Sequence, residues 1–344
     1  MKNIWMSGNI LCQYKGKLII QQRSKVYLYE ISTGRKIQLF DVPWYKRWGA
    51  RSRLIERLMR LNIREGKCFC GKFVFSQKGC IYTYDFSTGK LKINLEHKKG
   101  MRAPLKYTVL NNLNGFEKQI CFGEYFTDKE KREVRIVRST DGEKWETAYI
   151  FSKGLIRHIH GIYADFYKNQ VYILTGDTDE ESAIWIAKDN FKTVECLAKG
   201  KQCFRACQMW VRDDCLIWAS DSEYEQNYLY RMNKEKGSEV IKIKKLPGSV
   251  IYGDSDENSF VFSTTVEPDK GGIKEKKSIL YKINERYQIE ELCEFDKDIW
   301  SMKYFQYGYV NPILYNGNIY LSGNGIKKYD GKIIVVGKEG LYRA

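Results

Sequence analysis

Two closely spaced histidines in the middle of the chain have the residue type and spacing for acid–base or metal chemistry. The sequence has 344 residues and three histidines, of which two are His158 and His160. Residues two positions apart in an extended strand point to the same face. Such a pair could hold a divalent metal or act as acid and base, and it could equally be packed in a core. His158 and His160 are therefore candidate catalytic residues and candidate metal ligands.

Arginines and carboxylates recur around this pair in a regular order. Three successive segments each place an arginine before one apolar run and an acidic residue after the next run. The arginines are Arg102, Arg157 and Arg205, and the acidic residues are Glu124, Asp177, Asp179, Asp221 and Glu225, with Tyr125 next to the first. Guanidinium groups bind carboxylates in bidentate fashion, and carboxylates cleave glycosidic bonds as acid, base or nucleophile.

This order predicts a site for an acidic sugar. We expect catalytic roles for Glu124, Tyr125 and Asp177 beside the two histidines. We expect substrate binding by the other members, which are Arg102, Arg157, Arg205, Asp179, Asp221 and Glu225. Other interpretations stay open. The charges could simply neutralise one another, and Asp177 could have no role beyond capping the turn after Gly176. Tyr125 and Trp210 could stack on a sugar or simply pack.

The charge balance favours an anionic partner. Lys and Arg exceed Asp and Glu by 16, which suits an acidic glycan, a nucleic acid or a phosphorylated small molecule, although it could also be a solvated basic surface. Nucleic acid is the least favoured of these, because no module that reads bases is visible. The run from Lys274 to Lys277 is typical of loop charge.

Cysteine usage and hydropathy predict a reduced, cytoplasmic protein. Several of the ten cysteines lie in apolar runs, as small hydrophobic residues do. Cys68 with Cys70, or Cys203 with Cys207, could form half of a zinc site, but neither has a second pair at metal spacing. No run approaches the roughly 18 apolar residues of a membrane span, and the first nine residues lack the apolar run of a signal peptide. The oligomeric state stays open.

A repeated pattern of short strands predicts an all-β fold. Residues 27–36 (YLYEISTGRK) and 82–91 (YTYDFSTGKL) repeat a strand, a Ser-Thr-Gly turn and a second strand after about 55 residues. Because glycine supplies the positive φ of a tight turn, each copy predicts a hairpin between two outer strands.

Further apolar runs recur at intervals of about 45 to 50 residues. The runs at 119–122, 171–174, 215–218, 260–262 and 319–321 fit second strands of successive blades, and those at 134–137, 184–186, 228–230 and 279–281 fit third strands. Four short strands per period indicate a β-propeller, which a sandwich would not explain. We predict one domain over residues 1–344 with seven blades, and six or eight blades are alternatives.

One segment departs from the strand pattern. Residues 44–64 carry Leu54, Leu58 and Leu61 on one helical stripe, surrounded by Arg47, Arg51, Arg53, Arg57 and Arg60. This predicts a basic amphipathic helix inserted between blades. It could dock onto an anionic surface, or it could cap the propeller and leave its arginines in solvent.

The segment Ser139-Thr140-Asp141-Gly142-Glu143-Lys144-Trp145 resembles the Asp box, or BNR repeat, of the sialidase-like propellers, and residues 188–192 resemble a degenerate second copy. The resemblance implies a turn between the third and fourth strands of a blade, which bears on fold and not on catalysis. Residues 100–231 also look similar to glycosidase-like bacterial Asp-box proteins. The sialidase roles of an arginine triad, a Tyr/Glu pair and an aspartic acid would fall on Arg102, Arg157, Arg205, Tyr125, Glu124 and Asp177, although no Arg-Ile-Pro motif is present.

His158-Ile159-His160 resembles the metal-binding strand of oligogalacturonate-lyase-type propellers, which implies a divalent metal that neutralises a uronate carboxylate before β-elimination. We therefore expect a carbohydrate-active protein for acidic sugars, of glycoside hydrolase or uronate lyase type. The alternative is a non-catalytic propeller that binds an acidic glycan or a protein partner.

Overall fold

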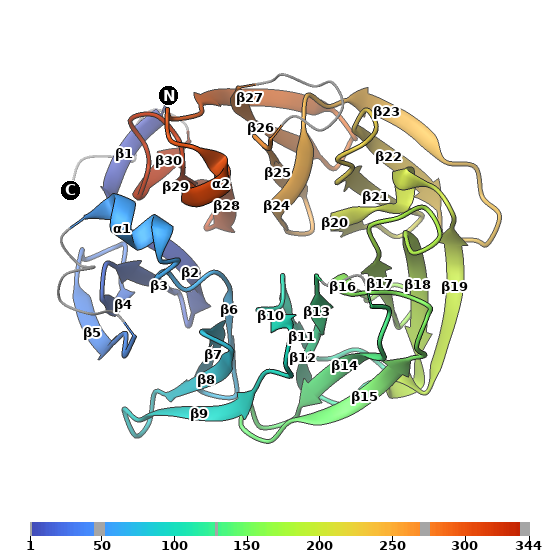
Figure 1. Cartoon of the computed structure of the whole chain (residues 1–344), viewed down its shortest axis with the longest axis horizontal. Helices are drawn as coiled ribbons and strands as arrows, with labels where there is room; N and C mark the ends of the chain where they lie inside the picture. The colour runs from blue at the N-terminus through green and yellow to red at the C-terminus, as the bar shows by residue number, and fades with distance from the viewer. Residues whose placement is uncertain (1, 45–51, 128–129, 269–275, 338–344) are drawn as a thin grey trace. The chain divides into compact units, whose positions relative to one another are not determined.

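The computed structural model describes residues 2–44, 52–127, 130–268 and 276–337. The chain forms two compact units, one from Met1–Ile63 with Pro247–Ala344 and the other from Arg64–Leu246. Within the described residues, the strands form seven four-stranded antiparallel sheets, which are the blades of a β-propeller (Figure 1). The fold class and the number of blades are confirmed, while one domain over the whole chain stays a prediction.

The unit Arg64–Leu246 contains four sheets whose strands follow chain order. They are β6 (Gly66–Phe69), β7 (Lys72–Gln77), β8 (Cys80–Asp85) and β9 (Leu91–Glu96); β11 (Tyr107–Leu110), β12 (Gln119–Gly123), β14 (Val134–Ser139) and β15 (Glu146–Phe151); β16 (Ile159–Asp165), β17 (Gln170–Thr175), β18 (Ala183–Lys188) and β19 (Thr193–Lys199); and β20 (Ala206–Val211), β21 (Cys215–Ser220), β22 (Tyr228–Asn233) and β23 (Ile241–Lys245). A small extra pair joins β10 (Met101–Arg102) to β13 (Tyr125–Phe126).

The other unit contains three sheets, one of which joins distant parts of the chain. Two follow chain order: β2 (Asn9–Tyr14), β3 (Lys17–Gln22), β4 (Lys25–Tyr29) and β5 (Lys36–Asp41); and β24 (Ser249–Ser255), β25 (Ser259–Thr265), β26 (Lys277–Asn284) and β27 (Ile289–Asp296). In the third, β28 (Tyr309–Tyr315), β29 (Asn318–Asn324) and β30 (Lys332–Val336) are completed by β1 (Lys2–Ser7), which pairs with β30.

The positions of the strands agree with the apolar pattern of the sequence. The expected second strands are found in β12, β17, β21, β25 and β29, and the expected third strands in β14, β18, β22 and β26. Second strands such as β17 and β21 are buried along their whole length, whereas the fourth strand β23 is mostly exposed. Continuous apolar runs therefore marked the second strands, because both of their faces are covered.

The expected turns lie between third and fourth strands. Asp141 Oδ1 accepts hydrogen bonds from the amides of Glu143 (2.7 Å) and Lys144 (2.8 Å) between β14 and β15, as the Asp-box resemblance implies. Asp85 Oδ1 makes the same kind of turn between β8 and β9. The second, degenerate copy is a short 3-10 turn, η2 (Asp189–Phe191), with Phe191 buried. These contacts stabilise hairpins and do not form a site.

The inserted helix differs from the sequence prediction in length and in the face that it buries. The helix α1 spans only Arg53–Leu58, and Arg47 and Arg51 lie outside the described residues. Leu58 is 47% exposed, whereas Arg57 is 1% exposed. The expected stripe is therefore present only in part: Leu61 is buried but follows the end of the helix, and the buried residues of the helix itself are Glu56 and Arg57.

Two arginines of α1 form ion pairs, and one of them, Arg57, is fully buried. Arg57 bonds to Asp298, and its Nε donates to the carbonyl oxygen of Phe305 at 2.9 Å. Arg53 makes ion pairs with Asp330 at 3.0 Å and with Glu56 at 2.7 Å. The helix is thus held by carboxylates of its own unit, next to the short helix α2 (Met302–Phe305).

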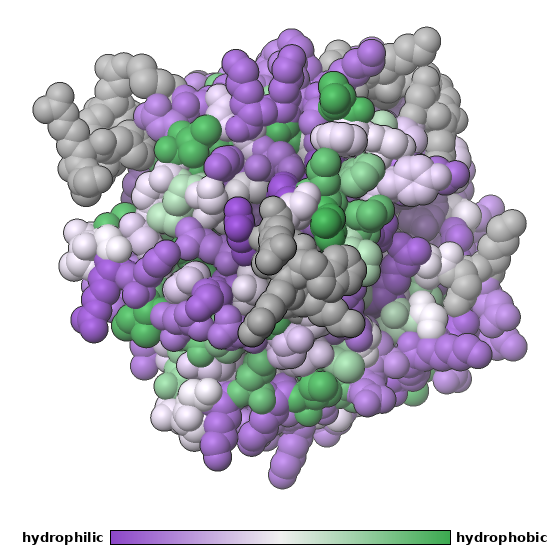
Figure 2. Space-filling view, turned by 60° about the vertical axis from the view of Figure 1, so that its left-hand side comes forward, coloured by the Kyte–Doolittle hydropathy of each residue, from purple (hydrophilic) through white to green (hydrophobic). Residues whose placement is uncertain are grey.

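Exposed hydrophobic residues form separate patches among hydrophilic ones on the face shown in Figure 2. The large hydrophobic residues that are exposed in the described part of the chain include Ile299, Trp300 and Tyr304. Membrane-spanning helices are not found in the described part of the chain, since no helix there combines the necessary length with the necessary hydropathy.

We predict that Arg57→Met destabilises the protein by about 1.5 to 3 kcal/mol, because it removes the buried guanidinium that bonds to Asp298 and to the carbonyl of Phe305, although Asp298 keeps its ion pair with Lys297. Urea unfolding followed by circular dichroism measures the change. The matched control is Arg35→Ala at an exposed turn, for which we expect a change within about 0.5 kcal/mol. Equal losses in the two variants would contradict a structural role for the buried arginine.

Candidate functional site

The two histidines lie at the start of β16, where the strand has an irregularity. Residue pairing with β17 shifts between Ile159 and Gly161, so His160 is an extra residue in the ladder. Such a β-bulge redirects a side chain. His158 forms an isolated β-bridge to Tyr125 just before the strand. Both imidazoles are buried, with exposures of 1% for His158 and 2% for His160.

Backbone carbonyls fix the proton positions of both imidazoles. His158 Nδ1 lies 2.8 Å from the carbonyl oxygen of Phe126, and His160 Nδ1 lies 3.0 Å from that of Ala206. Because a carbonyl can only accept, both Nδ1 atoms carry hydrogen. Both Nε2 lone pairs then face inward, with the two Nε2 atoms 2.9 Å apart. Lone pairs at this distance repel each other unless a proton or a cation lies between them.

Asp177 completes this group from the loop that follows β17. Its Oδ1 lies 3.3 Å from His158 Nε2 and 3.6 Å from His160 Nε2. Gly176 allows the approach, because its φ is +86° and a Cβ atom would lie 2.1 Å from the backbone of Glu181. The Asp177 side chain is 27% exposed, so the group reaches solvent on the side of this carboxylate.

Two of the three predicted arginines join the group. Arg205 Nη2 lies 3.1 Å from Asp177 Oδ1 and 3.4 Å from Glu223 Oε1. Arg157 Nε pairs with Glu181 at 3.0 Å, and its Nη2 is 3.9 Å from Asp177 Oδ2. The structure thus brings these two arginines and Asp177 together, and it adds Glu181 and Glu223, which the sequence analysis did not name; a substrate role for any of them stays a prediction.

The surroundings set the charge state of each group. Burial lowers the pKa of His160 below its ordinary 6.5, although Asp177 acts in the opposite direction. Burial would raise the pKa of Asp177, but its interaction with His158 and His160 holds it well below its ordinary 3.8. Burial also opposes the charge on Arg205, but Asp221, Asp177 and Glu223 raise its pKa. Asp177 is therefore ionised, and His160 is neutral near pH 7.

Tyr125 lies against the imidazole of His158. The two rings are stacked with centroids 4.2 Å apart and planes 20° apart. Burial, followed by the charge of Asp177, raises the pKa of the phenol above its ordinary 10.0. Tyr125 is only partly buried, so it presents a neutral phenol beside the histidines.

Glu124 is brought to the neighbourhood, but its carboxylate has other partners. Oε1 lies 2.7 Å from Arg135 Nη2 and 3.4 Å from Lys98 Nζ, and Oε2 accepts from the Arg135 amide at 2.9 Å. The side chain is 1% exposed. This geometry fits a structural charge pair that holds β12 to β14 better than it fits a sugar contact.

The remaining predicted residues lie around the group. Asp179 is exposed and accepts from Gln202 Nε2 at 2.8 Å. Arg102 and Glu225 are also exposed, and Arg102 pairs with Tyr125 across β10 and β13. Trp210 is 2% exposed, and the guanidinium carbon of Arg212 lies 4.6 Å from the centre of its ring. Packing therefore explains Trp210.

A second group of donors lies next to the first and was missed in part. Cys207, His160 and Asp221 place one ligand atom each within 4.8 Å of one another, as do His158, His160 and Asp177. Cys207 Sγ lies 3.2 Å from Asp221 Oδ2. Burial, followed by the charge of Asp221, raises the pKa of this thiol well above its ordinary value. The sequence had paired Cys207 with Cys203, because sequence spacing cannot show that a neighbouring blade supplies the histidine.

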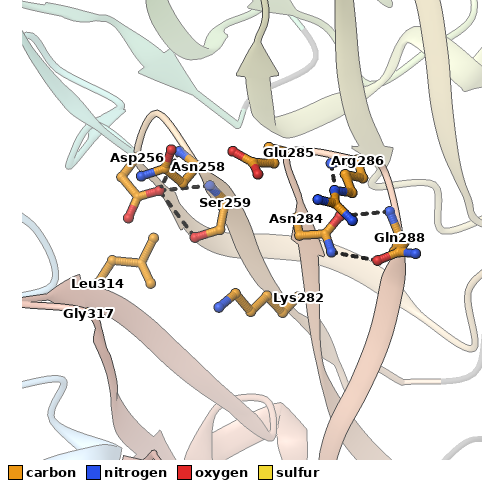
Figure 3. A pocket seen from close by; sticks show the side chains of 10 residues that line it. All are labelled: Asp256, Asn258, Ser259, Lys282, Asn284, Glu285, Arg286, Gln288, Leu314 and Gly317. Carbon is orange, nitrogen blue, oxygen red and sulfur yellow. Dashed lines mark hydrogen bonds between the residues drawn. The ribbon is translucent and has the colours of Figure 1, made fainter.

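A separate polar pocket of about 510 Å³ lies in the other unit (Figure 3). It is formed by the turns at Asp256 and Asn284 together with Lys282. Asp256 Oδ1 accepts from the amides of Asn258 and Ser259, and Asn284 Oδ1 accepts from those of Arg286 and Gln288. These side chains cap their own turns, so this pocket lacks the converging groups of the histidine cluster.

Comparison with known proteins supports the fold. No family model matches the chain, and no curated protein matches it by sequence. The solved structures that resemble it include an oligogalacturonate lyase from Vibrio parahaemolyticus, with a TM-score of 0.59 and 11% identity over 98% of this chain and 92% of that one. The AfRom2 CNH domain has a TM-score of 0.56 and 7% identity over 99% and 98% of the two chains.

A third similar structure is the extracellular domain of a one-component system from B. thetaiotaomicron, with a TM-score of 0.57 and 12% identity. It matches 97% of this chain, which spans only 39% of that protein. Identities this low establish the fold alone. The Asp-box family, which the turn at Asp141 resembles, stays a prediction.

The neutral state of His160 predicts acid sensitivity. Its folded pKa lies below 6.5, so the unfolded chain binds the proton first as pH falls. Stability should therefore decrease below about pH 6.5, by at most about 1.4 kcal/mol per pH unit. Urea unfolding at several pH values measures how the free energy of unfolding changes with pH. In His160→Gln this pH dependence should be weaker than in the wild type.

The matched control is His97→Gln, because burial also lowers the pKa of His97. That variant measures how much a buried histidine outside the group contributes to the pH dependence of the unfolding free energy. A pH dependence that His160→Gln leaves unchanged would contradict the neutral assignment.

Proposed function

We propose that this protein acts on acidic sugars as a uronate lyase, with its site at His158, His160 and Asp177. The observation that carries the proposal is the convergence of both Nε2 atoms and Asp177 Oδ1 within 3.6 Å of one another. The likeness to an oligogalacturonate lyase structure supports the same class of substrate.

The three atoms fit a divalent metal. Two imidazole nitrogens and a carboxylate oxygen form a common donor set for transition metals. In tetrahedral coordination at ordinary bond lengths, neighbouring ligand atoms lie about 3.3 Å apart. The separations from Asp177 Oδ1 are 3.3 and 3.6 Å, and the Nε2 atoms at 2.9 Å would move slightly apart. When bound, a divalent cation would neutralise a uronate carboxylate and acidify the adjacent C–H bond.

Arg157 is the arginine best suited to the substrate carboxylate. Its side chain is 18% exposed, and its Nη2 contacts Asp177 only at 3.9 Å. By contrast, Arg205 is 5% exposed and lies at 3.1 Å from the same carboxylate. Arg157 could therefore offer its guanidinium fork to a uronate, while Arg205 orients Asp177.

Asp177 and Tyr125 reach the solvent side of the group and could move protons. The second carboxylate oxygen of Asp177, Oδ2, is not part of the donor set and lies 3.9 Å from Arg157 Nη2, so it can accept the proton of the C–H bond next to the uronate carboxylate. The electron pair of that bond forms the new double bond as the neighbouring C–O bond breaks. Tyr125 keeps its proton at neutral pH, so its phenol can protonate the departing sugar oxygen.

A glycoside hydrolase is the less favoured alternative. Hydrolysis needs two free carboxylates on either side of the glycosidic bond. Glu124 is paired with Arg135 and Lys98, which leaves Asp177 as the partly exposed carboxylate next to the histidines.

We expect the protein to cleave oligogalacturonates with the gain of ultraviolet absorbance that a double bond conjugated to a carboxylate produces. Mass spectrometry separates the reactions, because elimination conserves the mass of the substrate and hydrolysis adds one water. His158→Gln and Asp177→Asn should each reduce the rate by at least about 100-fold. A chelator should reduce it, and Mn²⁺ should restore it.

His97→Gln serves as the control, since the third histidine lies outside the group. A neutral oligosaccharide of equal length tests the need for a carboxylate. Binding of the acidic sugar without any product would support the non-catalytic propeller instead, and a mass gain of one water would overturn the lyase assignment.

A further inference from the structure

Two neighbouring blades build their innermost strands in the same way. In β16 the extra residue of the bulge is His160, and in β20 the pairing shifts between Ala206 and Gln208, so the extra residue is Cys207. The backbone contacts agree, because the Gly176 amide bonds to the carbonyl of His158 and the Asp221 amide bonds to that of Arg205. Cys207 therefore occupies in one blade the position that His160 occupies in the blade before it.

Each blade also supplies a carboxylate just after its second strand, offset by one residue, because Asp221 aligns with Gly176 and Asp177 is the residue that follows it. Asp177 follows β17 and faces His160, and Asp221 follows β21 and faces Cys207 at 3.2 Å. The bulge of β2 carries Leu11 at this position, so the bulge itself does not require a polar residue. The thiol and the carboxylate of β20 and β21 thus repeat the donor pattern of the first group with a softer ligand.

The charges near this second pair favour a cation. Asp177, Asp221 and Glu223 surround Arg205, whose single positive charge all three carboxylates stabilise. Asp221 is 7% exposed and Cys207 is 2% exposed, so little solvent reaches them. Buried negative charge is stabilised by an added cation.

We propose that Cys207, Asp221 and His160 form a second metal site that takes a soft divalent cation such as Zn²⁺ or Cd²⁺. The three ligand atoms already lie within 4.8 Å of one another. Binding replaces the S–H proton by the metal and releases that proton to solvent. Thiolate ligands select soft cations, whereas the His158, His160 and Asp177 set suits harder ones.

The two sets compete for one nitrogen. His160 Nδ1 donates to the carbonyl of Ala206, so Nε2 is the atom that either set can use. A soft cation held by Cys207 therefore displaces Mn²⁺ from the first set. The second metal site depends on the proposed function only through this shared histidine. The cadmium–thiolate band tests the second site, and lyase activity tests the proposed function.

The test titrates the full chain with Cd²⁺ and follows the ultraviolet charge-transfer band of a cadmium–thiolate bond. Wild type should develop the band with one equivalent, and Cys207→Ser should lose it and bind Cd²⁺ at least about tenfold more weakly. His158→Gln should keep the band while losing Mn²⁺ binding. Cys70→Ser, which removes an exposed thiol, is the matched control and should keep the band.

A band that survives in Cys207→Ser, or that disappears in His158→Gln, would overturn the second site. X-ray absorption of the zinc-loaded wild type gives an independent answer without any variant, because a first shell without sulfur would also overturn it. Lyase activity without the band contradicts the second site alone, whereas the band without lyase activity contradicts the proposed function alone.

Discussion

The hydrogen bonds from two imidazole Nδ1 atoms to backbone carbonyls are the constraint on which the site depends. The carbonyls of Phe126 and Ala206 belong to segments on either side of β16, so three parts of the chain must pack correctly before the imidazoles are oriented. Once oriented, the Nε2 atoms have no direction left except toward each other and Asp177. The donor geometry is thus a product of backbone architecture, and side-chain flexibility plays little part.

The propeller supplies this architecture through a local irregularity that it repeats. Bulges occur in the first strands β2, β16 and β20, where they turn one residue out of the regular alternation. Substitution of the bulge residue alone can therefore place a metal-binding or acid–base side chain in a blade without a change in its backbone. In this chain, leucine, histidine and cysteine occupy the position in different blades.

The sequence was sufficient for the blades but only partly for the site. Continuous apolar runs at 171–174 and 215–218 identified second strands, since burial on both faces leaves a clear signal. The repeat also indicated that loops of neighbouring blades share one face, where the structure has Arg157, Arg205 and Asp177 within reach of one another. Glu124 could not be assigned in this way, because its partner Arg135 comes from the next strand. The helix α1 was misjudged because leucine spacing says nothing about buried ion pairs, which hold Arg57.

The two units become complete at different stages of protein synthesis. Every residue of the histidine and cysteine groups lies within the continuous stretch Arg64–Leu246, whereas the other unit draws on both ends of the chain. Domains generally fold as units during synthesis. A nascent chain that has emerged beyond Leu246 already holds all the material of the site, while β1 must wait for β30 to leave the ribosome before it finds its partner. The histidine and cysteine groups can therefore form before synthesis is finished, whereas the sheet that contains β1 and β30 can be completed only after β30 has been made.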